Sequence, residues 1–307
     1  MARLLTVFGA TGQQGGAIIG HILATPSLSS AFSLRGITRD ASKKSAVALK
    51  NRGVEIVEAD LSDPSTLARA VAGSYAVFAV TNFWDDPQEG KEIAQGKAIA
   101  DAAVAAGVTQ IIWSSLPNIR EMTKGEVTGM KHFDGKAEVE AYIRTLNIKS
   151  AFILLGWYMQ NHLTLMLPKQ NEDGSYTLSV PWGPQARLPL IDIRDTGKFV
   201  EPALLDPDRY HHKRFTCATA FYSLEEMAET WSRVSGKNVK VNRVSDFSHF
   251  TGMSEEQKRE NLDVRKLGDY GYFGPDGEAE LAWTIEQVAT PLGTWEGFLR
   301  DHSPWFV

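Results

Sequence analysis

Short apolar runs alternate with amphipathic segments through the first half of the chain. Each apolar run has the length of a strand and ends in glycine or polar residues, as fully buried parallel strands do. The segments between them show the helical period of about 3.6 residues. The pattern predicts strands at 4–8, 33–38, 54–57, 75–81, 110–114 and 149–155, and helices at 17–23, 64–72, 88–106 and 132–146.

The alternation loosens after Gly156. The segment 245–277 is polar and has no clear period, while the tail at 292–307 is rich in aromatic residues and is expected to dock on the rest of the chain. The remaining pattern predicts helices at 157–167, 195–205 and 224–234 and a turn at 173–174.

Strands that alternate with helices form a parallel sheet that is covered on both faces. The predicted fold is therefore α/β: a doubly wound, mostly parallel Rossmann sheet with a smaller C-terminal α/β lobe. We expect residues 1–156 to form the Rossmann domain, completed by about 189–219. Residues 157–188 and 220–307 are expected to form the smaller lobe, which would bind a substrate or a partner.

Three glycines follow the first predicted strand, in the sequence Gly9-Ala10-Thr11-Gly12-Gln13-Gln14-Gly15. The pyrophosphate of a dinucleotide needs bare backbone N–H groups at a helix N-terminus, and glycines leave them uncovered. A buried strand precedes this loop and a helix follows it, which is the context that such a motif requires. The loop predicts a dinucleotide site; the alternative is a tight strand-to-helix turn that binds nothing.

The end of the second strand predicts which dinucleotide is bound. An acidic residue usually stands there in NAD-specific sites, whereas this strand ends at Thr38 and is followed by Arg39, with Lys43 and Lys44 close behind. A guanidinium forks onto a phosphate, so the cluster favours the 2′-phosphate of NADP(H). Asp40 argues against this reading because its charge would repel the phosphate, and the two lysines could instead only solvate the start of a helix.

Polar residues also follow the third and fourth strands, at the sheet edge where open α/β sheets bind ligands. Asp60 and Leu61 are expected to cover the adenine, and Thr81, Asn82 and Phe83 to lie beside the nicotinamide ribose. Asp60 could equally serve only to cap the next helix.

Composition narrows the class of partner. The net charge of −5 argues against a general grip on nucleic acid, and no apolar run is long enough to span a bilayer. One cysteine and scattered histidines (His211, His212, His249 and His302) predict neither disulfides nor a metal site. We expect a cytoplasmic monomer or homodimer, with a nuclear location open if the protein is regulatory.

Taken together, four stretches resemble the NmrA-like family of atypical short-chain dehydrogenases: 7–16, 81–84, 132–136 and 156–161. The family includes fungal regulators, an NADPH sensor and oxidoreductases. The resemblance implies that Arg39 and Lys43 lie near the adenosine phosphate and that Lys136 lies near the nicotinamide ribose. It places Tyr158, Met159, Gln160 and Asn161 along the far end of the cofactor. Sensor-type members carry a lysine where this chain has Ala94, which weakens the carry-over of sensing, although Lys91 is one turn away.

The catalytic pair of short-chain dehydrogenases is a tyrosine and a lysine four residues apart on one helix face. This chain has His132 and Lys136 at that spacing, without the tyrosine. Either His132 or Lys136 relays the proton, or the site binds cofactor without hydride transfer. Ser114 and Ser115, at the end of the fifth strand, could orient a substrate carbonyl or only satisfy the loop backbone.

Two functions follow from this reading. The first is an NADPH-dependent oxidoreductase that reduces a small organic carbonyl or enone, with the cofactor supplying the hydride. The second is a catalytically inactive NADPH/NADP redox sensor that regulates a protein partner. A sequence-specific DNA binder is disfavoured, because no recognition motif is present and the charge has the wrong sign.

Overall fold

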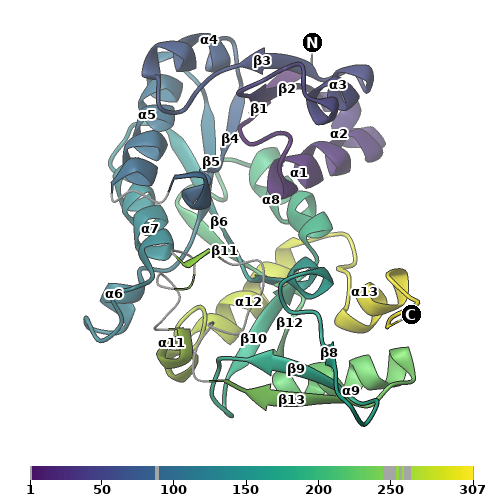
Figure 1. Cartoon of the computed structure of the whole chain (residues 1–307). Coiled ribbons are helices and arrows are strands. Elements are labelled where there is room, and N and C mark those ends of the chain that lie inside the picture. The colour runs from purple at the N-terminus through teal and green to yellow at the C-terminus, as the bar shows by residue number, and fades with distance from the viewer. Residues whose placement is uncertain (1, 87–89, 245–253, 256–257, 259–263, 307) are drawn as a thin grey trace.

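A twisted parallel sheet forms the centre of the computed structural model, which describes residues 2–86, 90–244, 254–255, 258 and 264–306 (Figure 1). Its seven strands lie in the order β11-β6-β5-β4-β1-β2-β3, and every neighbouring pair is parallel. The strands are β1 Arg3–Val7, β2 Phe32–Thr38, β3 Glu55–Glu58, β4 Ala76–Ala79, β5 Gln110–Ser115, β6 Lys149–Leu155 and β11 Lys213–Cys217. The doubly wound Rossmann sheet predicted from the sequence is confirmed.

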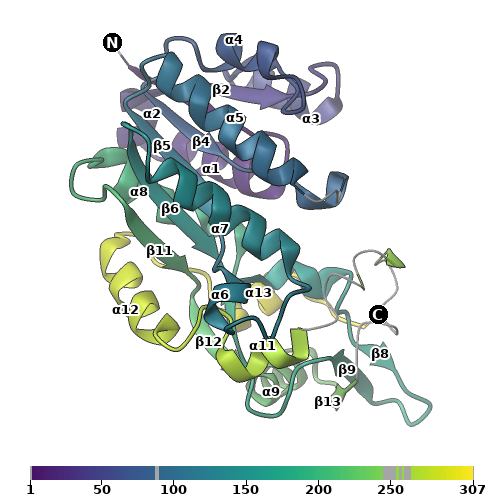
Figure 2. The ribbon, with the colours of Figure 1, turned by 90° about the vertical axis from the view of Figure 1, so that its left-hand side faces the viewer.

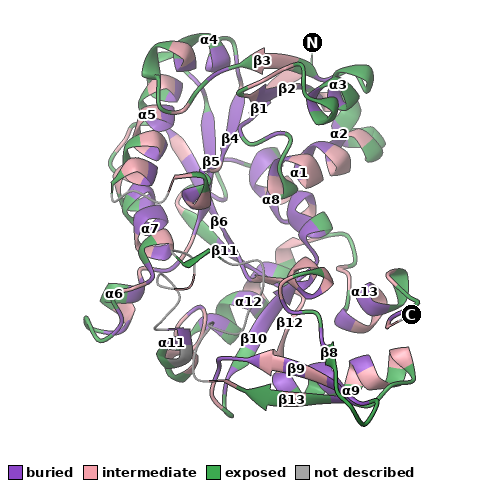
Figure 3. Ribbon diagram, in the orientation of Figure 1, coloured by how far each residue is buried: buried purple, intermediate pink, exposed green. Residues whose placement is uncertain are grey.

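Helices cover both faces of this sheet (Figures 1 and 2). One layer contains α1 and α8, which pack on each other, and the other contains α4, α5 and α7. The buried residues lie along the strands and the inward faces of these helices (Figure 3). The helices of this part are α1 Gln13–Ala24, α2 Pro26–Ala31, α3 Lys44–Asn51, η1 Pro64–Thr66, α4 Leu67–Val71, η2 Phe83–Asp85, α5 Lys91–Ala105, α6 Ile119–Met122, α7 Lys131–Ile143, η4 Ile193–Asp195 and α8 Thr196–Leu205. The start expected at 88 for the helix α5 lies outside the described residues.

The helix predicted at 157–167 is wrong. The chain instead forms a short strand, β7 Trp157–Tyr158, and then a 3-10 segment, η3 Met159–Leu163. Strand β7 pairs with β10 Arg187–Ile191, and this contact comes from far along the chain. Gly156 permits the close approach, because a Cβ atom there would lie 2.2 Å from the carbonyl oxygen of Pro189. A distant pairing therefore overrides the local apolar period.

Two small sheets follow the central one, in the orders β12-β10-β7 and β13-β9-β8. The positions of their strands were not predicted, since the strands are short and most of them pair with distant segments. Strands β8 and β9 are the exception, because they form a local antiparallel pair around the turn expected at 173–174. The helix expected at 224–234 is confirmed, and Ser223 and Glu226 form a reciprocal capping box at its start. The additional elements are β8 Lys169–Gln170, β9 Tyr176–Val180, β12 Ala220–Ser223, β13 Val239–Arg243, α9 Leu224–Ser235, α11 Val264–Tyr270, α12 Gly277–Gln287 and α13 Trp295–Asp301. Of the polar segment 245–277, residues 245–253, 256–257 and 259–263 lie outside the described part of the chain.

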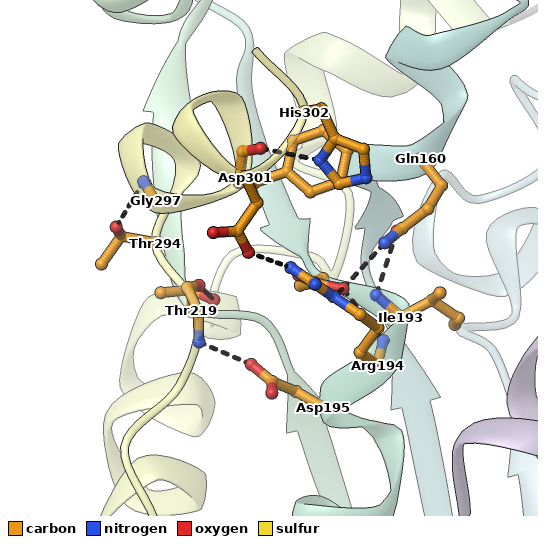
Figure 4. Close-up of polar contacts among 12 residues, drawn as sticks. Gln160, Ile193, Arg194, Asp195, Thr219, Thr294, Gly297, Asp301 and His302 are labelled. Atoms are coloured by element: carbon orange, nitrogen blue, oxygen red, sulfur yellow. Dashed lines mark hydrogen bonds and ion pairs between the residues drawn. The ribbon is translucent and has the colours of Figure 1, made fainter. Parts of the chain in front are cut away.

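The C-terminal tail docks as expected. Trp295 and Phe298 of α13 are fully buried against the two small sheets and α9. Polar contacts fix the same region: Arg194 bridges Asp192 and Asp301 through distances of 2.6 and 2.8 Å. Figure 4 shows the contact between Arg194 and Asp301. The tail is thus held to the segment that leads from β10 into α8. The division of the chain into a Rossmann domain and a smaller lobe stays a prediction.

An enclosed histidine makes the second hydrophobic cluster sensitive to acid; this cluster is separate from those of the central sheet and includes Leu178, Leu188, Trp231 and Trp295. His162 is completely buried between Trp231 and Trp295, and only its Nδ1 has a partner, the carbonyl oxygen of Met159 at 3.2 Å. Burial lowers the pKa of His162 to about 4. The unfolded chain therefore takes up a proton near the ordinary pKa of about 6.5, before the folded chain does, and stability falls as the pH drops from there towards 4.

At pH 5 we expect this proton to reduce the free energy of unfolding by roughly 2 kcal/mol relative to pH 7.5. Urea unfolding at the two pH values measures the loss, and His162→Phe should remove that part of the pH dependence. An equal loss of stability in the wild type and in the variant would contradict the assignment.

Candidate functional site

The glycine loop between β1 and α1 is built without room for side chains. Gly9 has a φ of +64°, a conformation that favours glycine. A Cβ atom on Gly15 would lie 2.3 Å from the carbonyl oxygen of Gly9, and one on Gly12 would lie 3.2 Å from it. Gly12 also donates its N–H to that oxygen at 2.9 Å. The loop therefore folds tightly back on itself, and each of its three glycines is needed.

The N-terminus of α1 is available to an anion. The helix begins after Gly12, which has no side chain with which to cap it, and the first turn contains no acidic residue. Gly9, Thr11 and Gln13 are exposed, while Ala10 is buried beneath the loop. Uncapped N–H groups and the positive end of a helix dipole together favour phosphate.

A cleft of about 450 Å³ opens above this loop. The loop lies on one side, the ends of β2, β3 and β4 form the floor, and the start of α5 closes the far side. Nine residues predicted as cofactor-binding line it: Gly9, Thr11, Gly12, Arg39, Lys43, Asp60, Leu61, Asn82 and Phe83. Residues that the sequence predicted from four separate loops therefore lie around one cavity.

The rim of the cleft contains an ion pair between Arg39 and Asp85, 2.9 Å apart. Asn82 holds Asp85 by donating its amide to the carboxylate at 2.8 Å. Arg39 is 61% exposed, so a ligand phosphate can reach its guanidinium in competition with Asp85. Lys43 lines the same part of the cleft.

Two acidic residues near the rim are occupied by their own loops. Asp40 accepts hydrogen bonds from the hydroxyl and the amide of Ser42, which lower the pKa of its carboxyl group. The Asp60 carboxylate accepts the N–H of Ser62 at 2.8 Å, and the following helix is capped by Asp63. Asp60 therefore holds a turn in the cleft wall, and Asp40 is turned to its own loop.

Lys136, on α7, is not among the residues that line the cleft; it lies in a buried polar cluster with Glu92, which does line it. Its Nζ atom donates to Glu92 Oε1 at 2.7 Å and to the carbonyl and hydroxyl oxygens of Thr81 at 3.1 Å each. The Thr81 hydroxyl in turn donates to Glu92 Oε1 at 2.7 Å. Helices α5 and α7 lie side by side here, which brings Glu92 and Lys136 together (Figure 2).

His132 lies one turn before Lys136, among aromatic rings. Phe83, Trp84 and Phe133 surround its imidazole, with ring centroids 4.8 to 5.7 Å away. Burial, with a smaller contribution from the charge of Lys136, lowers the pKa of His132 to about 3. The ring is therefore neutral near pH 7, and the structure gives no support to it as a proton donor.

The residues of the stretch 158–161 contact two different parts of the molecule, the glycine-loop segment and the second hydrophobic cluster. The Tyr158 hydroxyl accepts a hydrogen bond from Gln14 at 2.8 Å, and burial raises the pKa of this tyrosine to about 12. Met159 is completely buried in the second hydrophobic cluster. Gln160 binds Asp192 and the backbone of Ile193, and the carbonyl of Asn161 accepts the N–H of Met166. Among the hydrogen bonds that this stretch makes to described residues, that of Tyr158 reaches the glycine-loop segment.

Comparisons with known proteins agree with this arrangement. The sequence model of the NmrA-like family matches residues 1–299. The chain belongs to the NmrA-like family. It is 34% identical over 295 residues to the NmrA-like family domain-containing oxidoreductase cpsB of Aspergillus campestris, an alignment that covers 89% of this chain and 85% of that protein.

Solved structures share the NmrA-like fold. NmrA, a negative transcriptional regulator solved in complex with NADP, has a TM-score of 0.85 with this chain at 22% identity, covering 98% of this chain and 95% of that one. NmrA has also been solved with NAD. The Citrobacter sp. triphenylmethane reductase complexed with NADP(H) has a TM-score of 0.74 at 21% identity, covering 97% and 99%.

The sequence analysis missed three acidic residues that line this cleft, Asp85, Asp86 and Glu92. An acidic residue near the start of a helix normally faces solvent, so none of these positions had a distinguishing signal. Ser115, which was expected to orient a substrate carbonyl or to satisfy the loop backbone, donates its hydroxyl to Glu140 at 2.6 Å. This hydroxyl satisfies a carboxylate that is buried in the core.

The described ranges contain neither a candidate metal centre nor a candidate membrane span. No cluster of three or more histidine, cysteine, aspartate or glutamate side chains there could hold a metal ion; His249 lies outside these ranges. In the same part of the chain, no helix has both the length and the apolar character needed to cross a membrane.

Proposed function

We propose that this chain binds NADP(H) and is an oxidoreductase that reduces a small organic carbonyl or enone. The observation that carries the proposal is the cleft in which a bare glycine loop faces Arg39 and Lys43. Amides at a helix start suit the pyrophosphate, and two cations suit a phosphorylated ribose. The relative cpsB is named an oxidoreductase, and triphenylmethane reductase is solved with NADP(H).

The same residues support a choice between the two dinucleotides. NmrA is solved with NADP and with NAD, so the preference of this chain must come from its own rim. Strand β2 ends at Thr38, where an NAD site would have an acidic residue to accept hydrogen bonds from the ribose hydroxyls. The nearby carboxylate of Asp40 accepts a hydrogen bond from Ser42 within its own loop. Arg39 and Lys43 therefore favour the 2′-phosphate, with Asp60 and Leu61 beside the adenine.

The bound cofactor would supply the hydride, and the protein would position it. Lys136, Thr81 and Asn82 would face its nicotinamide half, with Gln14 and Tyr158 bordering the same end. The aromatic side chains of Phe83 and Trp84 offer an apolar wall for an organic substrate. The lobe formed by 157–188 and 220–307 would complete that side and select the substrate.

A second candidate is a redox sensor that responds to the NADPH/NADP ratio and regulates a protein partner. The observation in its favour is His132, which stands where reductases of this type place a tyrosine and has a pKa of about 3. NmrA, which shares the fold, is a negative transcriptional regulator. The two candidates share a cofactor and differ in turnover.

Calorimetry with NADPH and NADH, followed by turnover assays with quinones, enones and aldehydes, tests the proposal. We expect binding of NADPH in preference to NADH and steady NADPH oxidation with at least one acceptor. Arg39→Ala should weaken NADPH binding by about 10- to 100-fold, the value of a charge-assisted contact, and leave NADH within about twofold.

Lys44→Ala is the matched control, because it removes a neighbouring positive charge that does not line the cleft. It should bind both dinucleotides as the wild type does. Absence of NADPH binding would refute the cofactor assignment. Tight binding without turnover, together with a change of size on gel filtration, would refute the enzyme and favour the sensor.

A further inference from the structure

The buried cluster of Lys136, Thr81 and Glu92 leaves one side-chain polar atom without a hydrogen-bond partner. An ammonium group has three N–H donors, and Lys136 uses all three, on Thr81 and Glu92. The Thr81 hydroxyl also donates within the cluster. Of the side-chain polar atoms in this cluster, Glu92 Oε2 is the one that is buried and has no hydrogen-bond partner among the described residues.

Glu92 is one of the residues that line the cleft, although only 5% of it is exposed. A buried carboxylate oxygen that lacks a donor is costly, and native proteins usually satisfy it with a protein group, water or a ligand. Lys136 has no N–H to spare for a ligand unless it releases one of its present partners. The atom in this cluster that still needs a partner is therefore an acceptor, and it suits a ligand that donates.

The sheet order identifies which part of a dinucleotide would reach this atom. In the proposed site the adenosine half would lie over β2 and β3, where Arg39 and Asp60 are found, and the glycine loop would hold the pyrophosphate. The other half would then pass over β4, towards Thr81 and the start of α5. This half carries two kinds of donor, the hydroxyl groups of its ribose and the N–H groups of its carboxamide, and the ribose is the group next to the pyrophosphate.

We propose that Glu92 is a cofactor-binding residue whose Oε2 accepts a hydrogen bond from a hydroxyl of the nicotinamide-side ribose. Lys136 then serves to orient Glu92 and to balance its charge, and the carboxylate makes the contact. A hydroxyl that donates to a charged acceptor forms one of the stronger hydrogen bonds. The inference rests on the proposed NADP(H) site and adds to it the residue that recognises the second ribose.

Calorimetry with two ligands separates the halves of the cofactor. NADPH carries both riboses, whereas 2′,5′-ADP carries only the adenosine one with its phosphate. Glu92→Gln keeps the size of the side chain and replaces the acceptor Oε2 by a donor. We expect this variant to bind NADPH about 10-fold or more weakly and 2′,5′-ADP within about twofold of the wild type.

The control is Glu138→Gln, which breaks the other ion pair between the same two helices. Glu138 binds Lys97 at 2.8 Å, is exposed and lies outside the cleft, so this variant should bind both ligands as the wild type does. Near-UV circular dichroism checks that both variants are folded. NADPH binding by Glu92→Gln at wild-type strength, or equal weakening of both ligands, would overturn the inference alone. A wild-type protein that binds neither ligand would overturn the proposed cofactor and this inference with it.

Discussion

Replacing Gly15 with alanine is expected to weaken NADPH binding by at least about 100-fold, or about 2.7 kcal/mol. The added Cβ atom would lie 2.3 Å from the carbonyl oxygen of Gly9, which is backbone and cannot swing aside. The loop would have to open, and its amides would leave the position that a pyrophosphate requires. Calorimetry with NADPH measures the loss.

Gly20→Ala provides the control on the same helix. Gly20 has nothing within 4 Å of the position that a Cβ atom would take. Alanine inside a helix is favoured over glycine by about 0.5–1 kcal/mol, so this variant should be slightly more stable and should bind NADPH normally. If the Gly15 and Gly20 variants bound NADPH equally well, the loop would not be the phosphate site.

Replacing Lys136 with methionine is expected to lower the free energy of unfolding by about 3–5 kcal/mol. Lys136 and Glu92 are 8% and 5% exposed, and they form an ion pair 2.7 Å long. Removing the lysine leaves a buried carboxylate with no opposite charge, which costs more than the pair itself contributes. Urea denaturation of the wild type and the variant measures the difference.

The double variant Lys136→Met with Glu92→Gln separates this effect from the loss of packing. With the carboxylate also neutral, we expect it to recover more than half of the stability lost in the single variant. A single variant within about 1 kcal/mol of the wild type, or a double variant no more stable than the single one, would show that the pair is not buried in solution.

The Rossmann half of the fold could be predicted because its signals are local. Strand β6, expected at 149–155, is found at Lys149–Leu155, since residues 151–155 are an unbroken apolar run of the kind that a strand buried on both faces shows. Asp63, followed by Pro64, caps η1 as such a pair should. Most predicted residues of the cleft follow strands whose ends lie at one edge of the sheet.

The rest depends on contacts between distant segments. Trp157 and Tyr158 have an apolar pattern that suits a helix, and only pairing with β10 makes them extended. Glu92 has the sequence context of a solvated first-turn acid, and its burial comes from α7, over 40 residues away in the chain. For the same reason the sequence could not show that Gln160 would donate a hydrogen bond to Asp192.

The ion pairs that attach helix α13 to the rest of the chain reach towards the cleft. Asp301 holds Arg194, Arg194 holds Asp192, and Asp192 holds Gln160, two residues after the tyrosine that accepts a hydrogen bond from Gln14. Polar contacts therefore lead from α13 to Gln160, and two residues of backbone connect Gln160 to the tyrosine that contacts α1. We expect a change that loosens the aromatic tail near residue 300 to be felt at the contact between Tyr158 and Gln14.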